Sequence, residues 1–140
     1  MGINNYNTMR IKITIVLLVL LGLSSCENEE NYRFFDIGVE NSFRFDREYQ
    51  SSDDLMNFSV ININDSRCPT DVVCVWEGKA DVTIEVEGPL AGTIVLNTYD
   101  NLIDTIGNYS FELKEVLPHP ISTETIELKD YRVTLKIEGI

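Results

Sequence analysis

The 140-residue sequence predicts an all-β fold: a single antiparallel β-sandwich, immunoglobulin-like in architecture, with about seven or eight strands. Short segments in which apolar and polar residues alternate recur along the chain, as in strands that bury one face. Turn-forming residues separate these segments, and no stretch has a convincing helical period. A small β-barrel is the alternative that the same pattern allows.

The first 25 residues have the pattern of an export signal. Arg10 and Lys12 precede a predominantly apolar run of eleven residues, 13–23. A helix that crosses a bilayer needs about 20 residues, so this run fits the hydrophobic part of a signal peptide better than a transmembrane span.

The run ends in Leu23-Ser24-Ser25-Cys26, which resembles the lipobox of bacterial lipoproteins. The resemblance implies cleavage between Ser25 and Cys26, a diacylglycerol on the Cys26 thiol and acylation of its freed amine. Several acyl chains anchor a protein stably, so the membrane becomes a partner through this lipid. The implied location is the cell envelope, on the periplasmic face of the outer membrane or on the cell surface. An ordinary cleaved signal peptide with a chance cysteine is the alternative.

Residues 26–31 form an acidic tether ahead of the domain, which we place at 32–140. Acidic residues directly behind the lipidated cysteine resemble the signal that sends lipoproteins of the Bacteroidetes to the outer face of the outer membrane; a solvated spacer is the alternative. The mature chain keeps 9 basic and 23 acidic residues, a net charge of −14. Such a charge repels nucleic acid and anionic lipid surfaces, and no basic patch with interleaved aromatics is visible in the sequence, so we exclude nucleic acid as a partner.

In the domain, the clearest alternating segment is 81–87, where Val82, Ile84 and Val86 share one face and charged residues the other. The segments 42–45, 109–113 and 131–137 repeat this pattern. In 58–63 the apolar residues change parity, which predicts a β-bulge or a strand buried on both faces.

The segment 65–78 holds two of the three cysteines and the only tryptophan. Cys68 and Cys74 enclose five residues, so a disulfide between them would close a short turn and stabilise the fold by about 2 kcal/mol. Asp65 and Arg67 flank the first cysteine, and we expect them to bind the loop backbone or each other. We expect the apolar residues that follow the turn to enter the core, namely Val72, Val73, Val75 and Trp76; for Trp76, lining a binding groove is the alternative.

Redox or metal chemistry is the alternative role for the two cysteines. A redox motif needs C-x-x-C beside a βαβ pattern, and a zinc site needs four ligands, whereas the chain offers two thiols and the remote His119. We therefore favour a structural disulfide, which an exported protein can keep oxidised, and expect no cofactor.

A second resemblance covers the same region. The pattern Asp65-Ser66-Arg67-Cys68-Pro69, Cys74-Val75-Trp76, Gly78 and Ala80 resembles one found in small uncharacterised secreted proteins and lipoproteins of bacteria. The likeness extends to 111–120 and to the final strand. It implies a β domain with a disulfide-closed loop and no particular activity.

No catalytic constellation is evident in the sequence. His119 is the only histidine, and no serine stands in a nucleophile-elbow setting to partner it, so we expect it on a surface loop. Carboxylate pairs could in principle serve glycoside hydrolysis, but 23 acidic residues create such pairs by chance. The pairs concerned are Asp53 with Asp54 and Asp71 with Glu77.

Two further sites are hypotheses of binding or modification. Asn62, Asn64 and Asp65 could offer oxygen ligands to calcium, but their spacing does not match an EF-hand loop, and we predict no metal site. Asp104-Thr105-Ile106 resembles the short motif at which exported proteins of the Bacteroidetes receive O-glycans, which implies glycosylation of Thr105. We expect that segment, 101–106, to be a loop or one helical turn.

Together these features predict a lipid-anchored, non-enzymatic envelope protein that binds an unknown protein or glycan partner. The alternative is a small exported hydrolase or inhibitor. A deep pocket with two convergent carboxylates would favour the hydrolase, and an exposed apolar patch with aromatic residues would favour the binding module.

Overall fold

The computed structural model describes residues 33–140, and every structural statement below concerns that part of the chain. Cys26, the signal peptide and the tether lie outside it. The described residues form nine strands and two short 3-10 helices, all inside the predicted domain 32–140. The strands are β1 Arg33–Phe35, β2 Glu40–Arg44, β3 Glu48–Ser51, β4 Asn57–Asp65, β5 Ala80–Glu87, β6 Gly92–Asn97, β7 Ile103–Ile106, β8 Tyr109–Leu117 and β9 Arg132–Gly139; the helices are η1 Gly88–Leu90 and η2 Leu128–Asp130.

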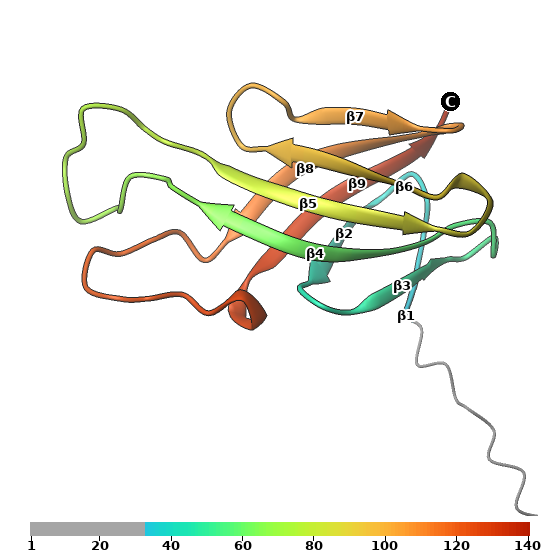
Figure 1. The fold of residues 1–140 in the computed structure, drawn as a ribbon, viewed down its shortest axis with the longest axis horizontal. Helices are drawn as coiled ribbons and strands as arrows, with labels where there is room; N and C mark the ends of the chain where they lie inside the picture. The colour runs from blue at the N-terminus through green and yellow to red at the C-terminus, as the bar shows by residue number, and fades with distance from the viewer. Residues whose placement is uncertain (1–32) are drawn as a thin grey trace, which may run out of the picture. The chain divides into compact units, whose positions relative to one another are not determined.

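The strands form two sheets packed face to face, with the orders β1-β3-β4-β5-β6 and β2-β9-β8-β7 (Figure 1). All neighbouring strands are antiparallel except the short β1, which pairs in parallel with β3. The predicted sandwich is confirmed, with two separate sheets in place of the alternative closed barrel. The expected strand number was too low, because β1 and β7 are too short to show a pattern in the sequence. No helix within residues 33–140 is long and apolar enough to cross a bilayer.

The apolar residues that alternate along the strands form the core, as the sequence predicts. Val82, Ile84 and Val86 are buried, and their strand neighbours Thr83 and Glu85 lie on the outer face. Buried residues from the other sheet complete the core: Phe43, Tyr109, Phe111, Leu113, Tyr131, Val133, Leu135 and Ile137.

The parity change in 58–63 is a β-bulge. The register between β4 and β5 shifts between Val60 and Asn62, so Val60 and Ile63 are both buried while Ile61 is exposed. A second shift, between Leu113 and Glu115 on β8, returns Val116 to the core. The apolar residues change parity here too, from Leu113 to Val116, although two charged residues, Lys114 and Glu115, separate them.

The segment 101–106 differs from the expected loop or helical turn. Ile103–Ile106 is strand β7, at the edge of its sheet, with Thr105 opposite Ser110 of β8. Thr105 is therefore an exposed residue on an edge strand. Four residues with alternating exposure are too few to separate a strand from a turn by periodicity.

Candidate functional site

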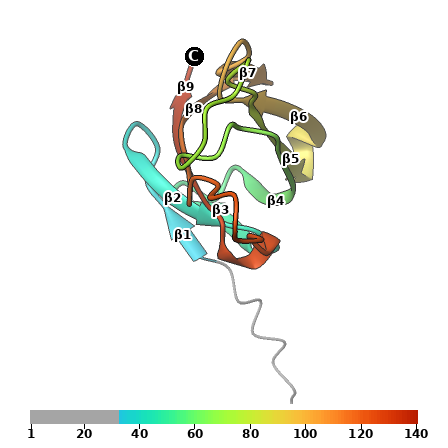
Figure 2. The same cartoon turned by 90° about the vertical axis from the view of Figure 1, so that its left-hand side faces the viewer.

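The most prominent feature of the surface is the connection between β4 and β5, residues 66–79, which we call the Cys68–Cys74 loop. At its base the hairpin continues past the sheet: Ser66 N–H donates to the Lys79 carbonyl at 2.8 Å, and Cys68 N–H donates to the Glu77 carbonyl at 2.7 Å. The loop projects from one end of the sandwich, beside the β8–β9 connection (Figures 1 and 2). The Cys68–Cys74 loop is therefore carried on a rigid extension of strands β4 and β5.

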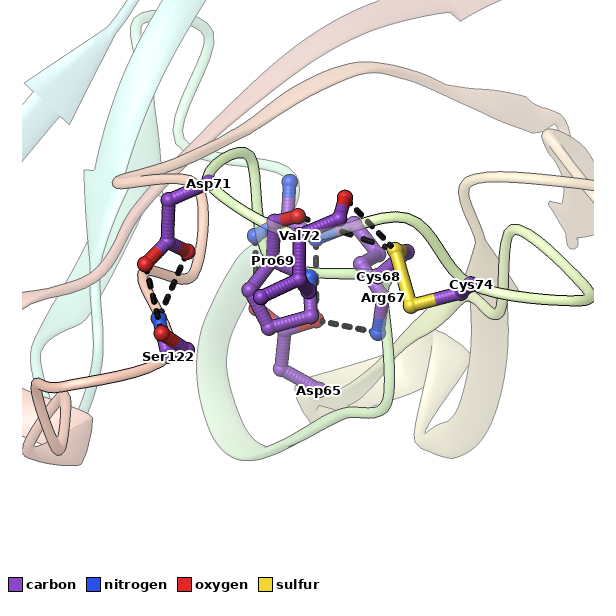
Figure 3. The surroundings of a disulfide bond; sticks show 8 residues. All are labelled: Asp65, Arg67, Cys68, Pro69, Asp71, Val72, Cys74 and Ser122. Atoms are coloured by element: carbon purple, nitrogen blue, oxygen red, sulfur yellow. Dashed lines mark hydrogen bonds and ion pairs between the residues drawn. A yellow bond between two sulfur atoms is a disulfide. The ribbon is translucent and has the colours of Figure 1, made fainter.

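Two kinds of link hold the loop in place. The predicted disulfide between Cys68 and Cys74 is present, with the two Cα atoms 5.9 Å apart. Across to the β8–β9 connection, Asp71 accepts hydrogen bonds from the backbone N–H of Ser122 at 2.8 Å and from its hydroxyl at 2.5 Å (Figure 3). These bonds from Ser122 lower the pKa of Asp71. Asp71 is thus occupied in fixing the loop.

The apolar residues of the loop do not enter the core, and that prediction was wrong. Val73 is 100% exposed, Val75 95% and Trp76 80%, and Val72 is exposed as well. The hairpin base carries this segment beyond the end of both sheets, where no facing layer exists to cover it. Large contiguous apolar exposure of this kind is unusual for a solvated loop and is typical of interaction surfaces.

Asp65 and Arg67 anchor the loop to the sandwich, as predicted. Arg67 donates from Nε to Asp65 Oδ1 at 2.9 Å and from Nη2 to Oδ2 at 2.6 Å. It also donates to the carbonyls of Val116 at 2.7 Å and Pro118 at 2.9 Å. The Tyr131 hydroxyl donates to Asp65 at 3.0 Å. One arginine therefore connects the loop base with the start of the β8–β9 connection.

A hollow of about 520 Å³ lies on one side of the loop, lined by Trp76, Glu77, Gly78, Lys79 and Tyr99. Tyr99 is exposed and comes from the β6–β7 turn. Nothing in the sequence places Tyr99 beside Trp76, because the two residues come from different connections between strands. Two aromatic side chains and a charged lysine thus meet at one concave surface.

The turn that carries Tyr99 is held by a buried amide. Asn97 is 5% exposed, and its Oδ1 accepts the backbone N–H groups of Tyr99, Asp100 and Asn101 at 2.9, 2.9 and 3.2 Å. Lys79 forms ion pairs with Asp81 and Asp100. Burial lowers the pKa of Lys79, but these carboxylates outweigh it and the net shift is upward. Lys79 therefore stays cationic in the hollow.

A second hollow, of about 490 Å³, shares Glu77, Gly78 and Tyr99 with the first and includes His119. His119 is exposed on the β8–β9 connection, as predicted for a surface loop. Glu77, Lys114 and Glu115 also line this hollow. Of the carboxylate pair Asp71 and Glu77, Glu77 lines this hollow and Asp71 does not.

The remaining candidate residues lie elsewhere. Asp53 accepts hydrogen bonds from Ser51 and from the backbone N–H of Leu55, so it closes the β3–β4 turn. The calcium hypothesis is not supported, because both carboxylate oxygens of Asp65 are engaged by Arg67. Within residues 33–140, no group of three or more histidine, cysteine, aspartate or glutamate side chains is placed to hold a metal ion.

Removal of the disulfide is expected to destabilise the domain without unfolding it. We expect Cys68→Ser combined with Cys74→Ser to lower the free energy of unfolding by about 2 kcal/mol, because the closed loop is short. Urea unfolding followed by circular dichroism measures this loss. Reduction of the wild-type protein is the matched control and should give the same value. A collapse of the β-sheet spectrum in the variant would show that the fold itself depends on the bridge.

Gly78 is expected to tolerate no side chain. Its φ is +67°, and a Cβ there would lie 1.9 Å from the Ser66 carbonyl oxygen. We expect Gly78→Ala to lower the free energy of unfolding by more than the about 1–3 kcal/mol that strain at a positive φ costs by itself, because the added Cβ also clashes with the Ser66 carbonyl and disturbs the loop base. Gly88→Ala is the control, since Gly88 also has a positive φ, +87°, but open space around it. Equal losses in the two variants would contradict a crowded hairpin base.

Comparison of the chain with protein-family models, with curated protein sequences and with solved structures found no match.

Proposed function

We propose that this chain is a lipid-anchored protein of the bacterial cell envelope that binds a protein or glycan partner through the Cys68–Cys74 loop. The observation that carries the proposal is the exposure of Val73, Val75 and Trp76 on a loop closed by a disulfide. A loop already held in one conformation loses little entropy when it binds, so its apolar surface is available for affinity. Tryptophan and tyrosine are also the residues most often dominant in binding interfaces.

The hollow beside the loop supports the same proposal. Trp76 and Tyr99 offer aromatic faces, and Glu77 and Lys79 offer an acceptor and a donor. Sugar rings and peptide side chains both bind to surfaces that combine an apolar face with a few placed polar groups. Trp76 and Tyr99 do not have to move out of the core to make such contacts, because both side chains are already exposed.

The lipid anchor rests on the resemblance of Leu23-Ser24-Ser25-Cys26 to a lipobox. The location, on the outer membrane facing the periplasm or the cell surface, follows from the same resemblance and from the acidic tether.

Glycosylation of Thr105 is a separate proposal. Its side chain is exposed on the edge strand β7, and its backbone N–H donates to Asp104 at 2.7 Å. An exposed hydroxyl at a sheet edge is sterically open to a modifying enzyme. If the intact mass equals peptide plus lipid, and Thr105→Ala differs from it only by the mass of the substitution, Thr105 is not glycosylated and the proposal is wrong.

Inhibition of an exported enzyme is the second candidate, and the shape of the loop favours it. A protruding segment held by a disulfide and by the Asp71–Ser122 bonds can occupy a partner's cleft with little rearrangement. An inhibitor would give a one-to-one complex in which the loop is buried, whereas a general adhesion module would bind a repeated surface.

The test is site-specific photo-crosslinking in living cells. A photoreactive residue at Val73 is expected to give a discrete adduct, which disappears when Trp76→Ala is added. The matched control carries the same residue at Glu85, an exposed position on the outer face of β5. Adducts of equal yield at the two positions, or none at either, would contradict a binding role for the loop.

The anchor is tested on the same cells. The intact mass of the wild-type protein is expected to show residues 26–140 plus lipid, whereas Cys26→Ala should remain unlipidated. Protease treatment of whole cells then decides the membrane face: loss of the domain indicates the cell surface, and protection until the outer membrane is broken indicates the periplasm.

A further inference from the structure

The nine basic residues of the described domain fall into two groups. Five of them form ion pairs with carboxylates. These five are Arg67, Lys79, Lys114, Lys129 and Lys136. The other four are all arginines, and none of them forms an ion pair with another residue of 33–140: Arg33, Arg44, Arg47 and Arg132. In a domain with an excess of carboxylates, four arginines without such partners call for an explanation.

Three of these four arginines lie together at one edge of the sandwich, where they line one hollow. Arg33 on β1, opposite Tyr49, does not line it. Of the three, Arg44 on β2 stands directly opposite Arg132 on β9, and Arg47 lies in the turn that follows β2. We call this group the arginine edge. Figure 1 shows the β2–β3 turn close to η2 and the start of β9.

A hollow of about 570 Å³ lies at the arginine edge. Four cationic side chains and two carboxylates line it, so the net charge of its lining is +2, in a domain that is strongly acidic overall. The lining residues are Arg44, Phe45, Asp46, Arg47, Lys129, Asp130 and Arg132. The sequence shows no basic patch with interleaved aromatics, and the fold creates one around Phe45.

A bound anion would stabilise this arrangement, because the two carboxylates of the lining do not balance its four cations. Like charges directly opposite each other on neighbouring strands repel and destabilise a sheet, and Arg44 and Arg132 hold those positions. Arg132 is also fixed, because its Nη1 donates to the carbonyls of Lys129, Asp130 and Tyr131 at 3.5, 3.2 and 2.9 Å. A guanidinium held in this way has donors left for a planar, two-point contact with a phosphate group.

We propose that the arginine edge binds the phosphate groups of anionic lipids in the membrane that carries the protein, an inference that rests on the proposed lipid anchor. Arg33 follows Cys26 by seven residues, so the chain between them spans at most about 25 Å. The tether thus holds the arginine edge near the head groups at high local concentration, where a weak site suffices. At physiological salt, carboxylates more than about 8 Å away are largely screened, so the acidic remainder of the domain does not cancel the attraction.

The experiment measures the binding of residues 26–140 with Cys26→Ser, which carry no lipid but hold all nine strands, to vesicles. The vesicles contain phosphatidylcholine with about 30% phosphatidylglycerol, at about 0.1 M salt. We expect measurable binding, and a loss of about tenfold in the partition coefficient of the double variant Arg44→Gln and Arg47→Gln. Both arginines are exposed, so the variant should keep the wild-type circular dichroism spectrum.

The matched control is Lys114→Gln with Lys136→Gln, which changes the net charge by the same amount but removes two cations that already have carboxylate partners. We expect this control to change binding less than about twofold. Equal losses in the two double variants would mean that only overall charge matters, and absence of vesicle binding by the wild type would also overturn the proposal.

Two further measurements would identify a different ligand of the arginine edge. Inorganic phosphate is tested alone. If it binds, if this binding depends on Arg44 and Arg47, and if vesicles do not bind, the site takes free phosphate and the lipid assignment is wrong. If vesicles bind only after Glu27, Glu29 and Glu30 are all changed to glutamine, the chain's own acidic segment covers the edge, which also contradicts the proposal. Because the tested protein has no lipid, failure here leaves the proposed anchor intact, and the mass at Cys26 tests that separately.

Discussion

Arg67→Ala is expected to lower the free energy of unfolding by about 3–5 kcal/mol, because it leaves the Asp65 carboxylate buried without its charge partner. The side chain of Asp65 is 5% exposed and that of Arg67 10%. The variant also removes the donor to the Val116 carbonyl, on a strand at the centre of the other sheet. Urea unfolding at pH 7 measures the loss. Lys114→Ala, which breaks the more exposed pair with Glu112, is the control and should change stability by less than about 1 kcal/mol.

A double-mutant cycle separates the pair from its surroundings. Asp65→Asn removes the buried charge and should lessen the destabilisation caused by Arg67→Ala. The loss of free energy of unfolding in the double variant is therefore expected to be smaller than the sum of the two single losses by at least about 1 kcal/mol. Strict additivity of the two losses would show that Arg67 acts through the carbonyls of Val116 and Pro118 and not through Asp65.

The effect of Arg67→Ala should also depend on pH. Burial raises the pKa of Asp65, but the hydrogen bonds and the charge of Arg67 outweigh it, so the pKa lies below its ordinary value. A carboxyl whose pKa is lowered on folding contributes stability above its unfolded pKa and loses it as the pH falls through the folded pKa. The difference in the free energy of unfolding between wild type and Arg67→Ala is therefore expected to shrink as the pH falls from 7 into the acid range in which aspartates become protonated. A difference that stays constant over this range would contradict a charge interaction.

Tyr131 supports the same carboxylate and should not titrate with it. Burial, together with the nearby negative charge of Asp65, raises the pKa of Tyr131 to about 12. Its hydroxyl therefore stays protonated over the whole range in which Asp65 changes state, and it donates to Asp65 at 3.0 Å. The pH dependence of the Arg67→Ala effect can thus be assigned to the carboxylate.

The fold could be predicted because strand alternation is a local property of the sequence. Residues such as Ile84 and Leu135 are buried where their neighbours are not, and the parity change near Ile61 marks a bulge that the structure contains. The edge strands could not be predicted in the same way. β7 has four residues, and its position comes from pairing with β8, which is a tertiary contact.

The candidate site was only half predictable. The disulfide and the Asp65–Arg67 pair follow from residues close together in the chain, and both are present. The burial of Trp76 was predicted wrongly. An apolar run after a turn has the same sequence pattern whether the chain returns to a sheet or extends beyond it. The difference lies in the bonds between residues 66–68 and 77–79, which continue the hairpin past the core.

The arginine edge could not be predicted from the sequence at all. Arg44 and Arg132 are 88 positions apart, and only the pairing of β2 with β9 places them opposite each other. Net charge describes the average of a surface, and a sandwich can still concentrate the few cations it has at one edge. The expectation that a net charge of −14 repels anionic lipid therefore describes the surface as a whole and not each part of it.

The core between the sheets gives the second large prediction. Phe58 on β4 is 1% exposed and lies at the centre of an aromatic cluster that includes residues from both sheets. Its ring centroid is 4.9 Å from that of Phe43 and 5.8 Å from that of Phe111, both in the opposite sheet, and 5.3 Å from that of Phe35. Edge-to-face contacts of this kind add to the free energy gained from burial.

We therefore expect Phe58→Ala to lower the free energy of unfolding by about 3–5 kcal/mol, through lost burial and the cavity left between the sheets. Phe34→Ala is the matched control: Phe34 is 70% exposed on β1, so its loss should stay within about 0.5 kcal/mol. Circular dichroism is the appropriate probe, because the only tryptophan, Trp76, is already exposed in the folded state and its fluorescence should respond little to unfolding. If Phe58→Ala were no more damaging than Phe34→Ala, the cluster would not be what joins the two sheets, and stability would have to come from the Val82 and Leu135 region of the core instead.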